Sequence, residues 1–334
     1  MEYRKLISFG KNSFVVSLPK SWIKQNKLIK GDLIHISDNG SDLILSKKES
    51  DEKKKEKTKV IIVDGKPLLQ IEKEINSAYI LNYQTIILKG EKIKGNIASM
   101  QNFFQNLIAL EVMEQTPTTI VAKDFLHMDK VSVDELIHKM DMICRTMLKE
   151  SCTNFTDENY KNINERDKDV NRLYFLLYRS VLFNVDNPLR ALKNFKLSSI
   201  DMINMLFSGY YLEGMADEIR RTARYCRLLK IDKEGKKKLE DFLFKINDHY
   251  LETMKSYYAR DVKKALTISD VKKNLNKELD TLDKTNQGVA YYSSAIARMR
   301  RLISFIHNLG RIVYQGYNYF DVSDDPESLI PGPK

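Results

Sequence analysis

Residues 134–150, DELIHKMDMICRTMLKE, decide the fold class of this chain. Counted from Leu136, seven apolar side chains of this stretch fall at offsets 0, 1, 4, 7, 8, 11 and 12. Offsets of three and four repeat with the period of an α-helix and place these side chains on one wide stripe. The stretch therefore predicts an amphipathic helix that packs against other helices.

Helical patterning of the same kind continues from about Met128 to Phe320. We expect three long helices, a short break and three more, over residues 134–150, 159–184, 198–229, 233–260, 261–282 and 286–320. Ser198 and Ser199 precede an apolar run, which is typical of a helix N-cap. Two helical trios predict two stacked three-helix bundles, at 128–229 and 231–320, with a tail at 321–334.

Residues 60–125 change to alternating strands and helices. Apolar runs predict strands over residues 60–63, 85–88 and 118–121, and helices over residues 68–81 and 96–112. Alternation of this kind is typical of a small α/β unit, here a connector. It has none of the glycine fingerprint that a nucleotide site needs.

Residues 1–50 are β-rich. Strands are expected over residues 4–8 and 14–18, around a Gly10-Lys11-Asn12-Ser13 turn, and then over residues 33–36 and 43–45. Pro19 opens a short helix that reaches Gln25, in the first-turn position where its missing N–H costs nothing. A piece of this size cannot bury a good core alone, so we expect it to pair with a second copy. Residues 51–59 are charged without an apolar side chain and predict a linker.

Composition limits the class of protein. The chain has 334 residues, 43% hydrophobic and 30% charged, and its 13 Gly and 7 Pro favour long helices over a loop-rich fold. Of the formal charge of +10, the first 60 residues carry +6, with 14 Lys and Arg against 8 Asp and Glu. A basic end favours a polyanionic partner. The alternative is a solvated Lys-rich surface.

Several classes of chemistry are disfavoured. The three cysteines, Cys144, Cys152 and Cys226, lack CxxC spacing and lie in helical patterns, which predicts buried thiols in a reducing compartment. The five histidines are scattered, and no phosphate-binding loop or GxSxG motif occurs, so we expect no enzyme. The chain begins without an apolar signal core and has no apolar run of about 18 residues, so we expect a cytoplasmic protein.

The N-terminal residues resemble a known DNA-binding family. Leu18-Pro19-Lys20-Ser21-Trp22 and Lys30-Gly31-Asp32, in their order of strands and helix, resemble the SpoVT/AbrB (MazE-like) swapped-hairpin domain. The resemblance covers about fifty residues and implies a homodimer of interlocked hairpins on DNA. The side chains that it would place along the duplex are Arg4, Lys5, Lys11, Ser13, Lys20 and Lys24.

The helical half resembles PhoU, the phosphate-uptake regulatory protein. Residues 212–217, LEGMAD, have the ExxxD form of PhoU, and residues 165–174, ERDKDVNRLY, are similar to its companion helix. Residues 110–116, LEVMEQT, are similar to the connector of archaeal PhoU proteins that carry an AbrB-type head. The resemblance spans nearly the whole chain and implies a multidomain, mainly α fold of β module, α/β connector and two three-helix repeats.

In PhoU proteins the ExxxD carboxylates hold metal clusters. The resemblance implies a divalent or iron-type metal in the first repeat, at Asp167, Asn171, Glu213 and Asp217. Asn171 replaces an acid of the family pattern, and Arg300 and Ser304 stand where the second repeat would have its acids. An ordinary ion pair between Asp217 and Arg221, four residues apart, is the alternative use of the same residues.

A basic tract lies late in the helical half. Arg298-Met299-Arg300-Arg301, with Arg311, could form a positive surface that faces an acidic partner or attracts anions such as phosphate. A solvated helix face is the alternative.

Together the two resemblances imply a DNA-binding transcriptional regulator of phosphate uptake, whose helical body is a sensor or docking unit. An alternative is an accessory regulator of a phosphate transporter or its signalling system, in which the head serves only for dimerisation. A MazE-like antitoxin would fit the head, but antitoxins usually follow it with a short tail, whereas about 200 residues here predict a packed body.

Overall fold

The structure is a computed structural model that describes residues 3–11, 13–38, 43–47, 56–153, 155–185, 197–286 and 288–316. The predicted tail and most of the predicted linker lie outside these residues. The chain divides into two compact units, Met1–Glu56 and Lys57–Lys334, called here the N-terminal module and the body. The described part is mainly helical, with the small strands near the N-terminus.

The N-terminal module contains two antiparallel strand pairs and one short helix. β1 (Ile7–Phe9) pairs with β2 (Ser13–Val15), and β3 (Ile34–Asp38) pairs with β4 (Leu43–Lys47). Between the two pairs, α1 spans Lys20–Gln25. The first strand begins three residues later than predicted, because the turn at Gly10 (φ +72°) fixes the register of a short hairpin.

The module has almost no core of its own. Among its described residues only one hydrophobic side chain, Leu28, is buried. The others include large side chains that are mostly exposed, such as Phe9 (70%), Phe14 (67%), Ile29 (76%) and Leu33 (70%). Apolar surface on this scale is unusual for a module that stands alone in water.

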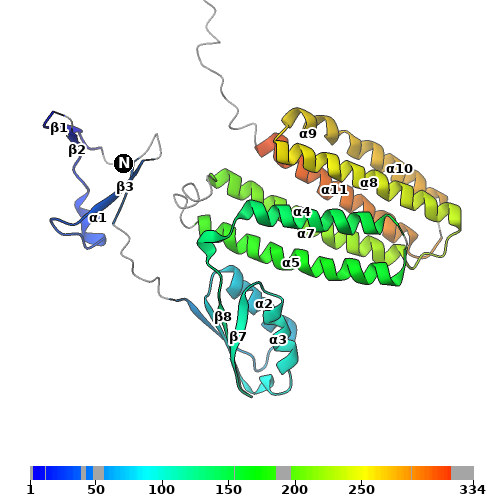
Figure 1. Ribbon diagram of the computed structural model, residues 1–334, viewed down its shortest axis with the longest axis horizontal. Coiled ribbons are helices and arrows are strands. Elements are labelled where there is room, and N and C mark those ends of the chain that lie inside the picture. Colours follow the sequence, from blue (N-terminus) through cyan, green and yellow to red (C-terminus); the bar gives the residue numbers. More distant parts are fainter. Residues whose placement is uncertain are drawn as a thin grey trace, which may run out of the picture. The chain divides into compact units, whose positions relative to one another are not determined.

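The body begins with a four-stranded sheet that carries two helices. Its elements in chain order are β5 (Thr58–Ile62), α2 (Leu68–Ile80), β6 (Thr85–Lys89), α3 (Ile97–Gln105), β7 (Leu110–Gln115) and β8 (Thr119–Asp124). The strand order is β5-β6-β8-β7, with β5 and β6 parallel and the other pairs antiparallel. One face of the sheet packs against α2 and α3 (Figure 1).

The predicted helix over residues 96–112 is wrong beyond Gln105. The chain leaves the helix, passes Ala109 with a positive φ of 61°, and forms the edge strand β7 against β8. Leu110 and Val112 fit either period in so short a run, and antiparallel pairing with β8, the next strand of the chain, decided between them. β5 also begins at Thr58, inside the segment predicted as linker.

Long helices follow the sheet. They are α4 (Val133–Ser151), α5 (Asp157–Val185), α7 (Ser199–Cys226), α8 (Lys233–Ala259), α9 (Val262–Ser269), α10 (Val271–Thr285) and α11 (Tyr292–Gly316). The predicted Ser198 cap is confirmed, since Ser198 and Asp201 form a capping box. The predicted helix over residues 261–282 is instead two, α9 and α10, with a break at Asp270.

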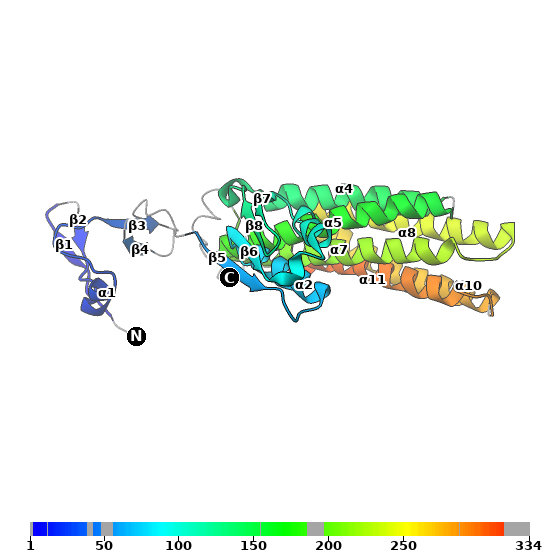
Figure 2. The ribbon, with the colours of Figure 1, turned by 90° about the horizontal axis from the view of Figure 1, so that it is seen from below.

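The helices share one hydrophobic core. α4, α5 and α7 pack against one another, and α11 packs along α7 and also contacts α8, α9 and α10 (Figure 2). Buried side chains of both helical trios belong to the same apolar cluster. α7 and α11 approach closely at Gly214, where a Cβ atom would lie 2.6 Å from Phe305 Cζ. A side chain at position 214 would therefore displace the ring of Phe305.

A buried ion pair joins the sheet unit to the helices. Arg179 of α5 is fully buried, pairs with Asp124 at the end of β8, and donates from Nε to Asn82 Oδ1 at 2.9 Å. Its guanidinium also lies 4.5 Å from the ring centroid of Tyr79 on α2. A charge buried in this way needs its partners, so these contacts fix how α2 and β8 meet α5.

Candidate functional site

The acidic residues of the predicted metal site do come together, on α5 and α7. Asp167 lies on α5 and Asp217 on α7, and Arg220 of α7 contacts both: its Nε is 2.9 Å from Asp167 Oδ2 and its Nη2 is 2.5 Å from Asp217 Oδ1. The other oxygen of Asp217 pairs with Arg221 at 2.6 Å, which confirms the predicted ion pair between these two residues. The acids are thus bridged by arginines.

The ion pairs continue as far as α11. Arg221 also contacts Glu218 at 3.3 Å, and Glu218 in turn lies 3.5 Å from Arg298 Nη1 and 3.3 Å from Arg301 Nε. We call the whole set, Asp167, Arg220, Asp217, Arg221, Glu218, Arg298 and Arg301, the ion-pair ladder. It alternates in charge and links three helices, α5, α7 and α11.

Burial changes the protonation of two acids near the start of the ladder. Burial, together with the neighbouring carboxylates of Asp217 and Asp167, raises the pKa of Glu213 to about 7. Burial also raises the pKa of Asp167 above its usual range, against the opposing effect of Arg220. Glu213 therefore exchanges its proton near neutral pH, and its charge there is partial.

The side chains present do not fit a metal ion well. Both oxygens of Asp217 and one oxygen of Asp167 face guanidinium groups, which a cation would have to displace. Asn171 donates its side-chain amide to the backbone carbonyl of Asp167 at 3.0 Å. Across the part of the chain that the structure describes, no three His, Cys, Asp or Glu side chains form a group able to hold a metal. The metal site stays a prediction that this geometry does not favour.

At the corresponding place in the second trio, Arg300 and Ser304 stand at the positions of the family's acids. Arg300 of α11 donates to Asp280 of α10 at 2.8 Å, and the hydroxyl of Ser304 donates to the carbonyl of Arg300 at 3.1 Å. The arginines of the basic tract on α11 therefore point in two directions. Arg300 points to α10, whereas Arg298 and Arg301 point to α7.

Glu218 was not predicted from the sequence to be a site residue. It is 1% exposed and sits on the stripe of α7 that also buries Met215 and Thr222. An acid on a buried stripe is rarely left without a cationic partner, and this signal was available from spacing alone. The partners themselves, on α11, are about eighty residues away in the chain and could not be found from local pattern.

The predicted DNA-contacting residues are exposed on the N-terminal module. Lys11 lies in the turn between β1 and β2, Ser13 begins β2, and Lys20 and Lys24 share one face of α1. Arg4 precedes β1 and donates from Nη1 to the hydroxyl of Ser17 at 3.4 Å. With Lys5, also exposed, these side chains are accessible to a partner.

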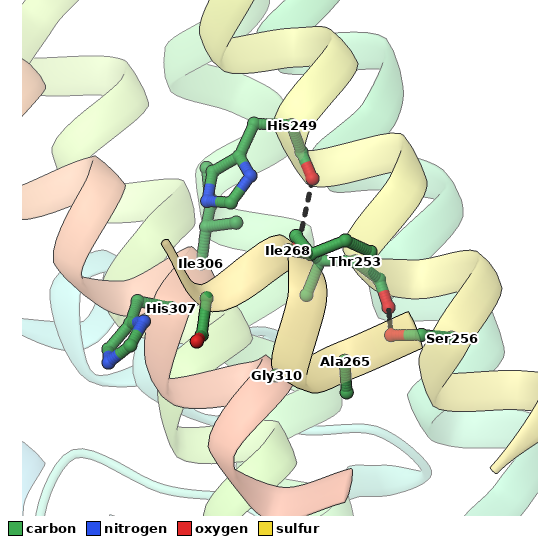
Figure 3. Close-up of a pocket in the computed structure, with 9 residues that line it drawn as sticks. His249, Thr253, Ser256, Ala265, Ile268, Ile306, His307 and Gly310 are labelled. Carbon is green, nitrogen blue, oxygen red and sulfur yellow. Dashed lines mark hydrogen bonds between the residues drawn. The ribbon is translucent and has the colours of Figure 1, made fainter. Parts of the chain in front are cut away.

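A small cavity lies between α8, α9 and α11 (Figure 3). Its volume is about 10 Å³, enough for a single water molecule, so it is no ligand pocket. His249 faces it with both ring nitrogens buried and without a hydrogen-bond partner among the described residues. Burial, with a smaller effect of His307, lowers the pKa of His249 to about 4. This histidine is therefore neutral at pH 7.

The cysteines follow the sequence prediction. Cys144, Cys152 and Cys226 are free and buried, and burial raises the pKa of Cys152 and of Cys226 to about 12. Thiols of this kind are poor nucleophiles, because the reactive form is the thiolate.

None of the described helices combines the length and the apolarity that a membrane crossing requires.

Part of the chain matches a known protein family. Residues 137–226 match the model of the PhoU domain. No curated protein and no solved structure matches the chain. The matched span runs from α4 to the end of α7 and includes Asp167, Asn171, Glu213 and Asp217. On this match, the part of the chain formed by α4, α5 and α7 is PhoU-like.

Proposed function

We propose that this protein is a DNA-binding transcriptional regulator of phosphate homeostasis, in which the N-terminal module contacts DNA as a homodimer and the PhoU-like body responds to phosphate status. The PhoU match supports the phosphate-linked part. The DNA-binding part is an inference from the module alone.

The observation that carries this inference is the coexistence of two surfaces on the module. Its described apolar side chains are mostly exposed, and Arg4, Lys5, Lys11, Lys20 and Lys24 are exposed beside them. Pairing with a second copy would bury the apolar surface and bring two sets of cations together. A doubled row of Lys and Arg side chains suits the phosphates of a duplex.

Most of these contacts would position the protein on DNA rather than read bases. A lysine ammonium is a point charge and makes no bidentate contact with a base edge. Arg4 is the best candidate for a base or minor-groove contact, because its planar guanidinium can pair with two acceptors at once.

Salt dependence tests the DNA interaction. If the dimer neutralises about six phosphates, the logarithm of the binding constant falls against the logarithm of salt concentration with a slope of roughly −5. Fluorescence anisotropy with a labelled random duplex measures this slope. An interaction with almost no salt dependence would argue against phosphate contacts.

Charge reversal separates DNA binding from simple dimerisation. In the full-length protein, the triple substitution Arg4→Glu, Lys5→Glu and Lys11→Glu should abolish duplex binding while the dimer persists in sedimentation. The matched control reverses three exposed lysines of the body, Lys139, Lys161 and Lys263. Equal loss in both variants would show a nonspecific effect of net charge.

Mapping of bound DNA in cells, at high and low phosphate, tests the regulatory part. Enriched sites whose occupancy changes with phosphate are the expected result. The absence of any enriched site would favour an accessory regulator of a phosphate transporter or its signalling system, with the module used only for dimerisation.

A further inference from the structure

Three arginines converge on one buried carboxylate at the end of the ion-pair ladder. Arg221 of α7 and Arg298 and Arg301 of α11 lie 3.3, 3.5 and 3.3 Å from the oxygens of Glu218. We call these three residues the arginine cluster. α7 and α11, which carry it, pack side by side (Figure 2).

The arginine cluster is more than Glu218 needs for its own neutralisation. A single bidentate guanidinium can satisfy a buried carboxylate, and such charge-assisted hydrogen bonds are about 2.7–2.9 Å long. Here three guanidinium groups share one carboxylate at longer distances, so Arg298 and Arg301 are held in place with donor capacity unused. Arg298 Nε is also buried without a hydrogen-bond partner among the described residues.

The ladder as a whole carries an excess of positive charge. It contains four guanidinium groups against three carboxylates, and Arg221 is shared between Asp217 and Glu218. The excess falls at the end near α11, since Glu218 is the one acid that Arg298 and Arg301 contact among the described residues.

The two signs of charge differ in exposure. The side chain of Glu218 is 2% exposed, whereas those of Arg298, Arg221 and Arg301 are 26%, 37% and 60% exposed. A solute that approaches this surface therefore meets guanidinium groups and not the carboxylate. Arg301 contacts Glu218 through Nε, so its two terminal nitrogens remain for an external acceptor.

We propose that the arginine cluster binds a tetrahedral oxyanion, with inorganic phosphate as the ligand. Glu218 acts as a positioning residue that holds the three guanidinium groups together from behind. The planar forks of arginine match the oxygens of phosphate, and groups positioned in advance lose little entropy on binding. The choice of phosphate among oxyanions rests on the phosphate-linked part of the proposed function, whereas the need for an anion rests on geometry alone.

Calorimetric titration of the full-length protein with inorganic phosphate tests the site. The ionic strength is kept constant with chloride and no DNA is present. The unaltered protein should bind phosphate, and Arg301→Gln should weaken binding by about tenfold or more, which is typical of a lost hydrogen bond to a charged group. Absence of binding to the unaltered protein would overturn the proposal.

Arg300→Gln is the matched control. Arg300 is the next residue on the same helix and carries the same charge, but it pairs with Asp280 on α10. Phosphate affinity should change by less than about threefold in this variant. Equal weakening in both variants would overturn the proposal, because it would show a diffuse effect of net charge.

Thermal unfolding provides a second measurement. A ligand that binds only the folded state raises the melting temperature as its concentration increases. Phosphate should raise the melting temperature of the unaltered protein and of Arg300→Gln more than that of Arg301→Gln. The same three proteins should bind duplex DNA equally without phosphate, so failure of the oxyanion site and failure of DNA binding are separate results.

Discussion

The N-terminal module and the helical body use their apolar residues in opposite ways. In the body, side chains from seven described helices form one buried cluster. In the module, Leu28 is the one buried apolar side chain among the described residues, while Phe9 and Phe14 are about two thirds exposed or more. The body thus contains its own stabilising core. The module has large apolar side chains of the kind that form a core, but most of those described are exposed.

The body and the module therefore obtain their stability from different sources. Burial contributes about 25 cal/mol for each Å² of apolar surface removed from water, and in the body this burial is within one chain. The module can gain the same contribution only from a partner. Stability of the body should therefore be independent of protein concentration, and that of the module should not.

The largest expected effect belongs to the body, at the ion pair between its sheet and its helices. Arg179→Met leaves Asp124, whose side chain is 3% exposed, as a buried charge without its arginine. We expect a loss of about 3–5 kcal/mol in the free energy of unfolding. Unfolding of the protein in urea measures this loss.

Arg172→Met is the control on the same helix. It removes an ion pair with Asp169 at the surface, where the two charged groups are 3.7 Å apart, and should cost less than about 1 kcal/mol. Similar losses in the two variants would show that the ion pair between Arg179 and Asp124 does not stabilise the body.

The second effect is the response of the body to acid. His249 is buried with a pKa of about 4, below its usual value of about 6.5 in the unfolded chain, so the folded state favours the neutral ring. Its contribution to stability is therefore fully present above pH 6.5 and is lost as the pH falls towards 4. The expected loss is about 3 kcal/mol.

Comparison with a matched histidine isolates this effect. His249→Phe should flatten the dependence of the melting temperature on pH between 7 and 4, whereas His138→Phe, at an exposed position of α4, should leave it unchanged. If the melting temperatures of the two variants depend on pH in the same way, His249 is not the group responsible for the loss of stability in acid. Acid stability is then a property of the body's surface and not of its core.

The third effect concerns the module and tests the comparison most directly. Phe14→Asp places a charge on a side chain that is 67% exposed in a single chain. If the module pairs with a second copy, this change should cost about 2 kcal/mol or more in association and yield monomers at micromolar concentration. The melting temperature of the body should not change.

Analytical ultracentrifugation of the full-length protein measures the association. Leu69→Asp is the control, because Leu69 on α2 is 61% exposed and belongs to the body. That variant should remain a dimer. A Phe14→Asp protein that still dimerises would place the interface elsewhere and remove the contrast between the two parts.

Local signals in the sequence predicted most of the helical body. Ser198 was found as a cap, and the ion pair of Asp217 with Arg221 followed from a spacing of four residues. The same rules failed where two states fit one pattern. Leu110 and Val112 continued a helical stripe but lie in β7, because this segment pairs across a short turn with β8.

The candidate site shows the same division. Spacing and resemblance identified Asp167 and Asp217 as neighbours on one surface, and the structure brings them to the same arginine, Arg220. Spacing could not show that arginines would occupy the space between the acids. Nor could it show that Arg298 and Arg301 face Glu218 while Arg300, between them, faces another helix.

Local patterns in the sequence were enough to predict the helical class of the body, the cap at Ser198 and the basic character of the module. These depend on periodicity and local hydrogen bonds, which act over a few residues. The folded structure was needed to see the edge strand β7, the break at Asp270 and the partners that Glu218 has on α11. The reason is physical: a buried charge selects its counter-ion by distance in space, and two residues about eighty positions apart become neighbours only after the helices pack.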